Sequence, residues 1–157
     1  MNKPEQSPAE DRLAVIEVCT RMAWHTDRRE WTELRGVFAE KVRLDYTSLN
    51  GGGAVELTPD QIVGGWSELL GALDATQHLT TNHLVTVDGD AAVCTASFQA
   101  THLLANPFGA PLWTLGGTYR FDLVRRNGPW LIAGVVMTAV WADGNKDLLT
   151  LAAAAPQ

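Results

Sequence analysis

Residues 78–104 read HLTTNHLVTVDGDAAVCTASFQATHLL, and two long β-rich runs in this stretch flank the turn signal Asp88-Gly89-Asp90. An Asp-Gly pair between alternating apolar residues is a strong signal for a tight β-hairpin. A second signal of this kind, Asn127-Gly128, separates two later β-rich runs. We therefore expect four antiparallel strands, at residues 78–87, 91–104, 112–125 and 130–142.

The residues before this region predict helices. Three segments, Ser7–Glu10, Asp27–Glu30 and Thr58–Gln61, each place Glu or Gln three residues after Ser, Asp or Thr, which is the capping-box signature of a helix start. We expect helices at about 9–25, 28–39 and 59–73, a strand at 42–46 and a short helix at 146–152. Helices followed by a meander of strands indicate an α+β fold in which the helices cover one face of a curved, mostly antiparallel sheet.

Composition limits the function classes. The chain has 157 residues, of which 46% are hydrophobic and 19% charged, as in a single globular domain. We expect residues 1–7 and 153–157 to be flexible. A net charge of −6 without a Lys/Arg cluster argues against nucleic-acid binding.

No run of about 20 apolar residues is present, so no membrane span is expected and the protein is expected to be cytoplasmic. Cys19 and Cys94 lie within apolar patterns and far apart. We expect them to be buried thiols in a reducing compartment.

Strand alternation indicates which polar side chains point inward. His102 shares its parity with Phe98 and other apolar residues, and Tyr119 shares its parity with Trp113. Tyr46 alternates in the same way within the strand at 42–46. The pattern predicts an apolar cavity with a few polar groups, as in most ligand pockets.

His78 is the exception, because its parity partners Thr80 and Asn82 are polar whereas Leu79 and Val85 lie on the opposite parity. Alternation alone predicts that His78 is exposed. A β-bulge within Thr80-Thr81-Asn82 would reverse the parity and turn His78 inward.

Five segments together resemble the SnoaL-like branch of the nuclear-transport-factor-2 superfamily, with a motif pattern similar to that of scytalone dehydratase and bile-acid 7α-dehydratase. The resemblance implies a cone-shaped α+β fold and covers about residues 14–141. The segments are Asp27–Trp31, Val42–Tyr46, Thr76–His78, His102 and Gly128–Gly134.

The resemblance also implies roles for single residues. Asp27 and His78 fall where relatives have an Asp–His pair that removes a proton next to a carbonyl or a leaving group. Tyr46 falls on a Tyr that helps to polarise the carbonyl through water, and His102 falls on a second His implicated in acid catalysis or leaving-group contact. Tyr119 stands where an Asn contacts the substrate.

Alternative interpretations remain for these residues. Asp27 is fully explained as a helix N-cap, and His102 as a core histidine satisfied by a backbone carbonyl. Further residues expected to contact the substrate are Tyr119, Trp113, Phe98, Trp141 and Met22. Neither a metal-ligand cluster nor a phosphate-binding loop is visible in the sequence.

We expect a cofactor-independent lyase or isomerase, similar to a dehydratase, that abstracts a proton from an apolar, cyclic, carbonyl-bearing small molecule. One alternative is a protein without catalysis that binds a hydrophobic ligand or serves assembly. Another is a polyketide cyclase whose base is the acidic residue. We also expect a homo-oligomer, a dimer or a trimer, in which a sheet face is the interface.

Overall fold

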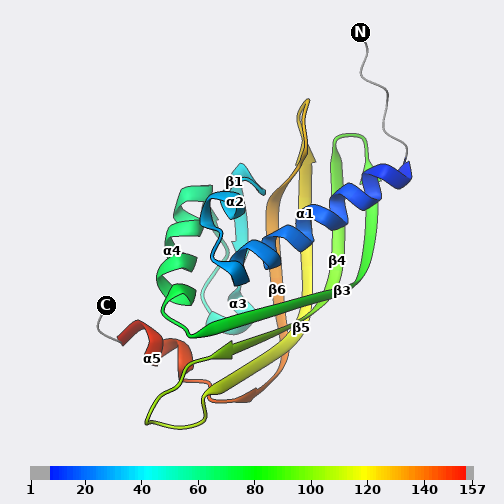
Figure 1. The fold of residues 1–157 in the computed structure, drawn as a ribbon. Helices are drawn as coiled ribbons and strands as arrows, with labels where there is room; N and C mark the ends of the chain where they lie inside the picture. Colours follow the sequence, from blue (N-terminus) through cyan, green and yellow to red (C-terminus); the bar gives the residue numbers. More distant parts are fainter. Residues whose placement is uncertain (1–7, 155–157) are drawn as a thin grey trace.

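The computed structural model describes residues 8–154, which form a curved six-stranded sheet with helices against it (Figure 1). The α+β class expected from the sequence is confirmed. The strands are β1 (Phe38–Asp45), β2 (Val55–Leu57), β3 (Ala75–Asp88), β4 (Ala91–Leu103), β5 (Leu112–Arg125) and β6 (Trp130–Gly144). The helices are α1 (Pro8–Arg28), α2 (Trp31–Arg35), α3 (Thr47–Asn50), α4 (Pro59–Gly71) and α5 (Leu148–Ala154).

The strand order is β2-β1-β6-β5-β4-β3. Only the β1–β6 pair is parallel among these strands, and the other neighbours are antiparallel. The long hairpins β3–β4 and β5–β6 lie at the two predicted turns, and β5 has the predicted bounds. The four long strands provide the broad inner face on which α1 packs.

Helix α1 crosses the inner face of the sheet (Figure 1). Val15, Cys19 and Met22 recur at three- and four-residue steps and are at most 3% exposed, as expected for the buried stripe of an amphipathic helix. Cys94 on β4 is also buried, and neither cysteine is in a disulfide. The prediction of two buried thiols is confirmed.

The second helix differs from its prediction at both ends. Helix α1 continues to Arg28, and α2 spans only Trp31–Arg35 before β1 begins at Phe38. The backbone N–H of Ile132 donates to Val37 O at 2.9 Å, which joins this segment to β6. A short helix is only marginally stable without tertiary contacts. The residues after Arg35 therefore pair with the sheet instead of extending α2.

The capping predictions have mixed outcomes. Gln61 N donates to Thr58 Oγ1 at 3.3 Å, and Thr58 N donates to Gln61 Oε1 at 2.9 Å, so the capping box of α4 is confirmed. The box at Asp27 is wrong, because Asp27 lies in the last turn of α1 and Glu30 is the N-cap residue of α2. The Asp27 carboxylate is therefore available for other contacts. The box at Ser7 lies outside the described residues.

A β-bulge interrupts β3. The β3–β4 register shifts between Thr81 and Leu84, and Asn82 has a positive φ of 55°. His78 is more buried than Leu79 before the bulge, whereas the buried Val85 follows it. The bulge proposed from the sequence is confirmed, and it turns His78 to the inner face.

A second irregularity lies in β6. Gly116 pairs with Trp141 and Gly117 pairs with Ala139, which leaves Val140 as an extra residue. Trp141 is consequently turned to the outer face, where it is 47% exposed. Its indole ring covers Gly116 so closely that a Cβ atom there would lie 2.4 Å from the ring. The prediction that Trp141 forms a pocket wall is wrong.

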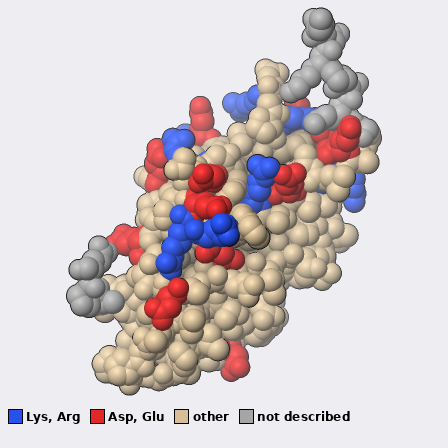
Figure 2. Space-filling view, viewed as in Figure 1, with Lys and Arg blue, Asp and Glu red and all other residues tan. Residues whose placement is uncertain are grey.

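The surface carries charges of both signs. On the face shown in Figure 2, acidic and basic side chains are intermingled near α1 and the neighbouring loops. None of the helices between residues 8 and 154 has the length and hydrophobicity needed to span a bilayer. The ends expected to be flexible were 1–7 and 153–157. Residues 1–7 and 155–157 lie outside the described residues, and Ala153 and Ala154 are the last residues of α5.

Candidate active site

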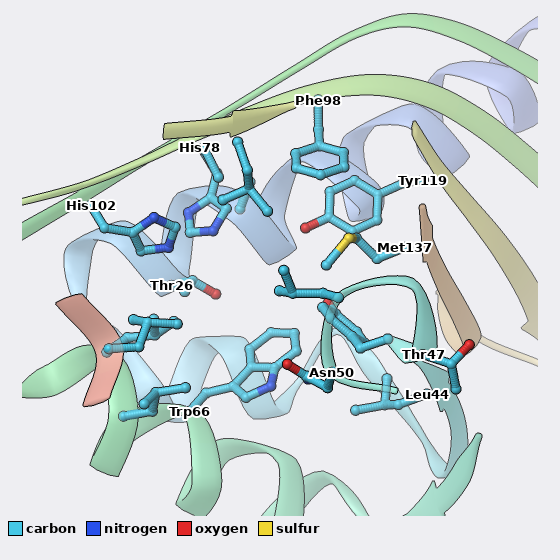
Figure 3. Close-up of a pocket in the computed structure, with 18 of the residues that line it drawn as sticks. Thr26, Leu44, Thr47, Asn50, Trp66, His78, Phe98, His102, Tyr119 and Met137 are labelled. Atoms are coloured by element: carbon cyan, nitrogen blue, oxygen red, sulfur yellow. The ribbon is translucent and has the colours of Figure 1, made fainter. Parts of the chain in front are cut away.

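A cavity of about 380 Å³ opens between the inner face of the sheet and helices α1, α3 and α4. Its lining is mainly apolar and contains a few polar side chains, the composition typical of small-molecule sites. The sequence-predicted residues that line it are Met22, Tyr46, His78, Phe98, His102, Trp113 and Tyr119 (Figure 3).

Asp27 lies behind His78 rather than in the cavity wall. Asp27 Oδ1 is 2.6 Å from His78 Nδ1 and accepts from Thr76 Oγ1 at 2.9 Å. Asp27 Oδ2 accepts from the backbone N–H of His78 at 2.7 Å. Both carboxylate oxygens are therefore bound by groups of β3, which fixes the carboxylate against the strand.

The Asp27 contact defines the tautomer of His78. An ionised carboxylate can only accept, so Nδ1 of His78 carries the proton in this pair. In the neutral ring, Nε2 is then the unprotonated nitrogen. His78 lines the cavity, and its side chain is 14% exposed. This arrangement can present a basic nitrogen to a bound ligand.

The environment of His102 differs from that of His78. Its ring lies 5.8 Å from that of His78, in an edge-to-face arrangement. His102 Nδ1 is 3.3 Å from Trp113 O, which can only accept. Burial, with the nearby His78, lowers the pKa of His102 to about 4. His102 is therefore neutral at pH 7, and its Nε2 is an acceptor. The role of His102 as an acid stays a prediction, and this tautomer does not favour it.

Two phenols complete the polar part of the cavity. Burial raises the pKa of Tyr119 to about 12, an effect that the Tyr46 hydroxyl partly offsets. Burial, together with Tyr119, raises the pKa of Tyr46 well above its ordinary value. Tyr119 packs between Phe98 and Phe121, with ring centroids at 4.6 and 5.3 Å. Both phenols stay protonated at neutral pH and can donate hydrogen bonds.

A second histidine–carboxylate pair lies near the same end of α1. His25 Nδ1 is 2.7 Å from Glu30 Oε2, and Glu30 Oε1 also accepts from Arg28 Nε at 2.7 Å. His25 does not line the cavity. Arg28 and then His25 lower the pKa of Glu30. Neither His25 nor Glu30 is among the residues that line the cavity, so this pair is not placed to act on a ligand there.

The sequence interpretation gave no role to three residues of the site. Thr76 donates a hydrogen bond to Asp27. It lies two residues before His78 on the same face of β3, and this spacing could have identified Thr76 from the sequence. Trp66 and Asn50 line the cavity from α4 and α3. The single turn of α3 is too short to produce a periodic pattern, so the sequence offered no signal for Asn50.

In the described part of the chain, no group of three or more His, Cys, Asp or Glu residues is arranged to hold a metal ion. The chemistry that can be argued from this chain rests on the imidazoles, the phenols and Asp27.

The family follows from a comparison with known domains. Residues 7–136 match the SnoaL-like domain, so the chain belongs to the SnoaL-like family, whose fold is of the nuclear-transport-factor-2 type. No functionally curated protein matches the sequence.

Solved structures share this fold. Kfla4162 of Kribbella flavida is 29% identical with a TM-score of 0.87, over 92% of this chain and 99% of that chain. A proposed aromatic ring hydroxylase of Novosphingobium aromaticivorans is 22% identical with a TM-score of 0.75, over 92% and 99%. A proposed scytalone dehydratase of the same species is 19% identical with a TM-score of 0.69, over 85% and 86%.

Proposed function

We propose that the protein is a cofactor-independent, dehydratase-like lyase or isomerase acting on an apolar, cyclic, carbonyl-bearing small molecule. Its central step is removal of a proton from the carbon next to the carbonyl, with His78 as the base and Asp27 as its partner. The family and the dehydratase among the structures of the same fold support the general class. The substrate and the roles of the residues are argued from the site itself.

The observation that carries the proposal is the 2.6 Å contact between Asp27 Oδ1 and Nδ1 of a cavity-lining His78. Once Nε2 accepts a proton, the ring becomes an imidazolium whose charge the adjacent carboxylate stabilises. Imidazole is the side chain that most often serves as a general base in proteins. General-base assistance of this kind contributes about 10²- to 10⁴-fold.

The phenols and His102 have separate tasks in this scheme. A Tyr119 or Tyr46 hydroxyl donates to the carbonyl oxygen as it gains enolate character. His102 accepts from a hydroxyl of the substrate through Nε2, because its Nδ1 proton is directed to Trp113 O. The pKa of Tyr119 near 12 keeps this donor protonated at neutral pH. If the phenol gives its proton to a departing hydroxyl, which leaves as water, the proton held by the His78 imidazolium replaces it, and both residues return to their starting states.

The polyketide-cyclase alternative, in which Asp27 is the base, is less well supported. Three donors already occupy the two oxygens of Asp27, and Asp27 does not line the cavity. A carboxylate held in this way is suited to orienting His78 rather than to reaching a substrate.

We also propose that the protein associates with copies of itself through the outer face of the sheet. Exposed apolar side chains lie there, including Leu79, Val140 and Trp141. Four uncharged residues that pair across neighbouring strands lie beside them: Thr81, Ser97, Thr118 and Thr138. An uncharged surface suits contact between copies that each carry a net charge of −6. Trp141→Lys should lower the mass measured by light scattering, and an unchanged mass would exclude this interface.

Hydrogen exchange at C2 of 1-indanone in D₂O, followed by NMR, tests proton abstraction. The wild-type protein should accelerate the exchange, and His78→Ala should reduce the acceleration by about 10²- to 10⁴-fold. His25→Ala is the matched control, since it removes the other paired imidazole near the same end of α1, and it should change the rate less than twofold. Wild-type exchange no faster than in buffer, or equal rates for His78→Ala and wild type, would exclude His78 as the base.

A further inference from the structure

Helix α3 is a single turn whose path is fixed by its own hydrogen bonds. Asp45 Oδ1 accepts from Thr47 N at 3.2 Å and from Thr47 Oγ1 at 2.7 Å. The backbone N–H groups of Leu49 and Asn50 both donate to Tyr46 O at 3.0 Å. The chain from Asp45 to Asn50 therefore has one defined conformation beside the cavity.

Ser48 determines which side of α3 faces the sheet. Its Oγ donates to Met137 O at 2.8 Å and accepts from Ala139 N at 2.9 Å. Both partners are backbone groups of β6, just before the extra residue Val140. Because Ser48 is directed to β6, the opposite side of the turn is left for the cavity.

Tyr46 and Asn50 occupy that opposite side. Tyr46 is the N-cap residue of α3 and Asn50 is its last residue, and the backbone N–H of Asn50 donates to Tyr46 O, so the two ends of the turn lie close together. Both residues line the cavity, and Figure 3 shows Asn50 beside Trp66 at its edge. Tyr46 is half-buried whereas Asn50 is exposed, so the phenol lies inside and the carboxamide lies at the mouth.

The carboxamide of Asn50 is available to a ligand. Within residues 8–154 it forms no hydrogen bond, whereas Asn106 and Asn145 bond backbone groups with their side chains. The residues that line the cavity with it include the apolar Val55 and Leu70. A carboxamide can donate and accept, so it can bind either a hydroxyl or a carbonyl oxygen in otherwise apolar surroundings.

We propose that Asn50 forms a second polar subsite, which binds an oxygen substituent on the outward end of the ligand. This inference rests on the proposed function, in which the inner phenols hold the reacting carbonyl. The substrate is accordingly a ring compound with two oxygen substituents on the edge that faces α3. Asn50 selects for the second oxygen, and Ser48 holds Asn50 in position.

Two probes that differ by one hydroxyl test the subsite. Calorimetric titration should give a dissociation constant for 5-hydroxy-1-indanone about three- to tenfold lower than for 1-indanone, as expected for one net hydrogen bond. Asn50→Leu removes the amide at nearly constant volume and should bring the ratio of the two constants to about one. The ratio of the two constants, rather than either constant alone, tests the subsite, and far-UV circular dichroism shows that the variant is folded.

His78→Ala separates this inference from the proposed function. It should abolish exchange at C2 of 1-indanone and leave the ratio of the two dissociation constants as in the wild type. A ratio that persists in Asn50→Leu, or a wild-type ratio of one, would overturn the subsite even if exchange is catalysed. If the wild type binds neither probe, both the subsite and the proposed function fail.

Discussion

Two histidine–carboxylate pairs form around the last turns of α1, and they are alike in distance and in the burial of the imidazole but differ in their surroundings. His78 Nδ1 lies 2.6 Å from Asp27, and His25 Nδ1 lies 2.7 Å from Glu30. The imidazoles are similarly buried, with 14% and 16% of their side chains exposed. Only His78 lines the cavity. A short contact of this kind therefore does not identify a base unless the other ring nitrogen can reach a ligand.

The carboxylates also differ in what else they bind. Glu30 is shared with Arg28, whose fixed positive charge neutralises it whatever the state of His25. The other donors to Asp27 are a hydroxyl and a backbone N–H, and among residues 8–154 it forms no ion pair with Arg or Lys. The charge of Asp27 is therefore available to an imidazolium at His78.

The largest effect is expected when each carboxylate becomes an amide. Asp27→Asn should lower the rate of C2 exchange in 1-indanone by about 10²-fold or more, because a neutral amide neither fixes the tautomer nor stabilises the imidazolium. Glu30→Gln should change it less than twofold. Similar losses in both variants would show that the comparison is mistaken.

His102 extends the comparison to a histidine without a carboxylate partner. Its pKa is lowered to about 4, whereas an unfolded histidine titrates near 6.5. Between these values the unfolded chain binds a proton that the folded chain does not, so stability falls as the pH decreases from about 6.5 to about 4. The loss should be on the order of 2 kcal/mol.

Urea unfolding at pH 7 and pH 4.5 measures this effect. His102→Gln should make the free energy of unfolding less dependent on pH in this range. An equal acid sensitivity in wild type and His102→Gln would mean that His102 is not held neutral.

A smaller effect is expected at Thr76, which donates to Asp27 Oδ1 at 2.9 Å. Thr76→Val keeps the shape and removes one of the three hydrogen bonds to the carboxylate. The exchange rate should fall by about three- to tenfold, in line with one net hydrogen bond. Thr20→Val is a suitable control, since Thr20 bonds only the backbone of α1 at the surface, and it should leave the rate unchanged.

The smallest effect concerns the stability that the His25–Glu30 pair provides. Glu30 keeps contact with solvent and lies outside the cavity, so Glu30→Gln should lower the midpoint of thermal unfolding by only about 2 °C or less. Circular dichroism during heating measures it. A decrease of about 10 °C would give this pair a structural importance that its exposure does not explain.

Local signals in the sequence were sufficient for much of the fold. The Asp-Gly and Asn-Gly turns located both long hairpins, and the Thr58 box located α4, because these features depend on a few neighbouring residues. The α2 segment was mispredicted since its fate is decided by distant pairing between Val37 and Ile132. Local propensity contains no information on that contact.

The site was predictable where alternation continued without interruption. His102, Trp113 and Tyr119 lie on uninterrupted parts of β4 and β5 and point into the cavity as their parity indicates. In the strands of His78 and Trp141, an extra residue interrupts the regular alternation of side chains between the two faces of the sheet. The bulge after His78 was considered because the resemblance required it, whereas nothing in the sequence indicated the extra residue beside Trp141.

The bulge at Asn82 also bears on how such a protein can change during evolution. His78 and Val85 are seven residues apart, and because side chains alternate with a period of two, they share the inner face only through the extra residue of the bulge. Loss of a single codon there would leave them six residues apart, and regular alternation would then keep both on the inner face. A change that straightened the strand without a deletion would instead turn either His78 or Val85 to solvent, with loss of the base or of part of the core.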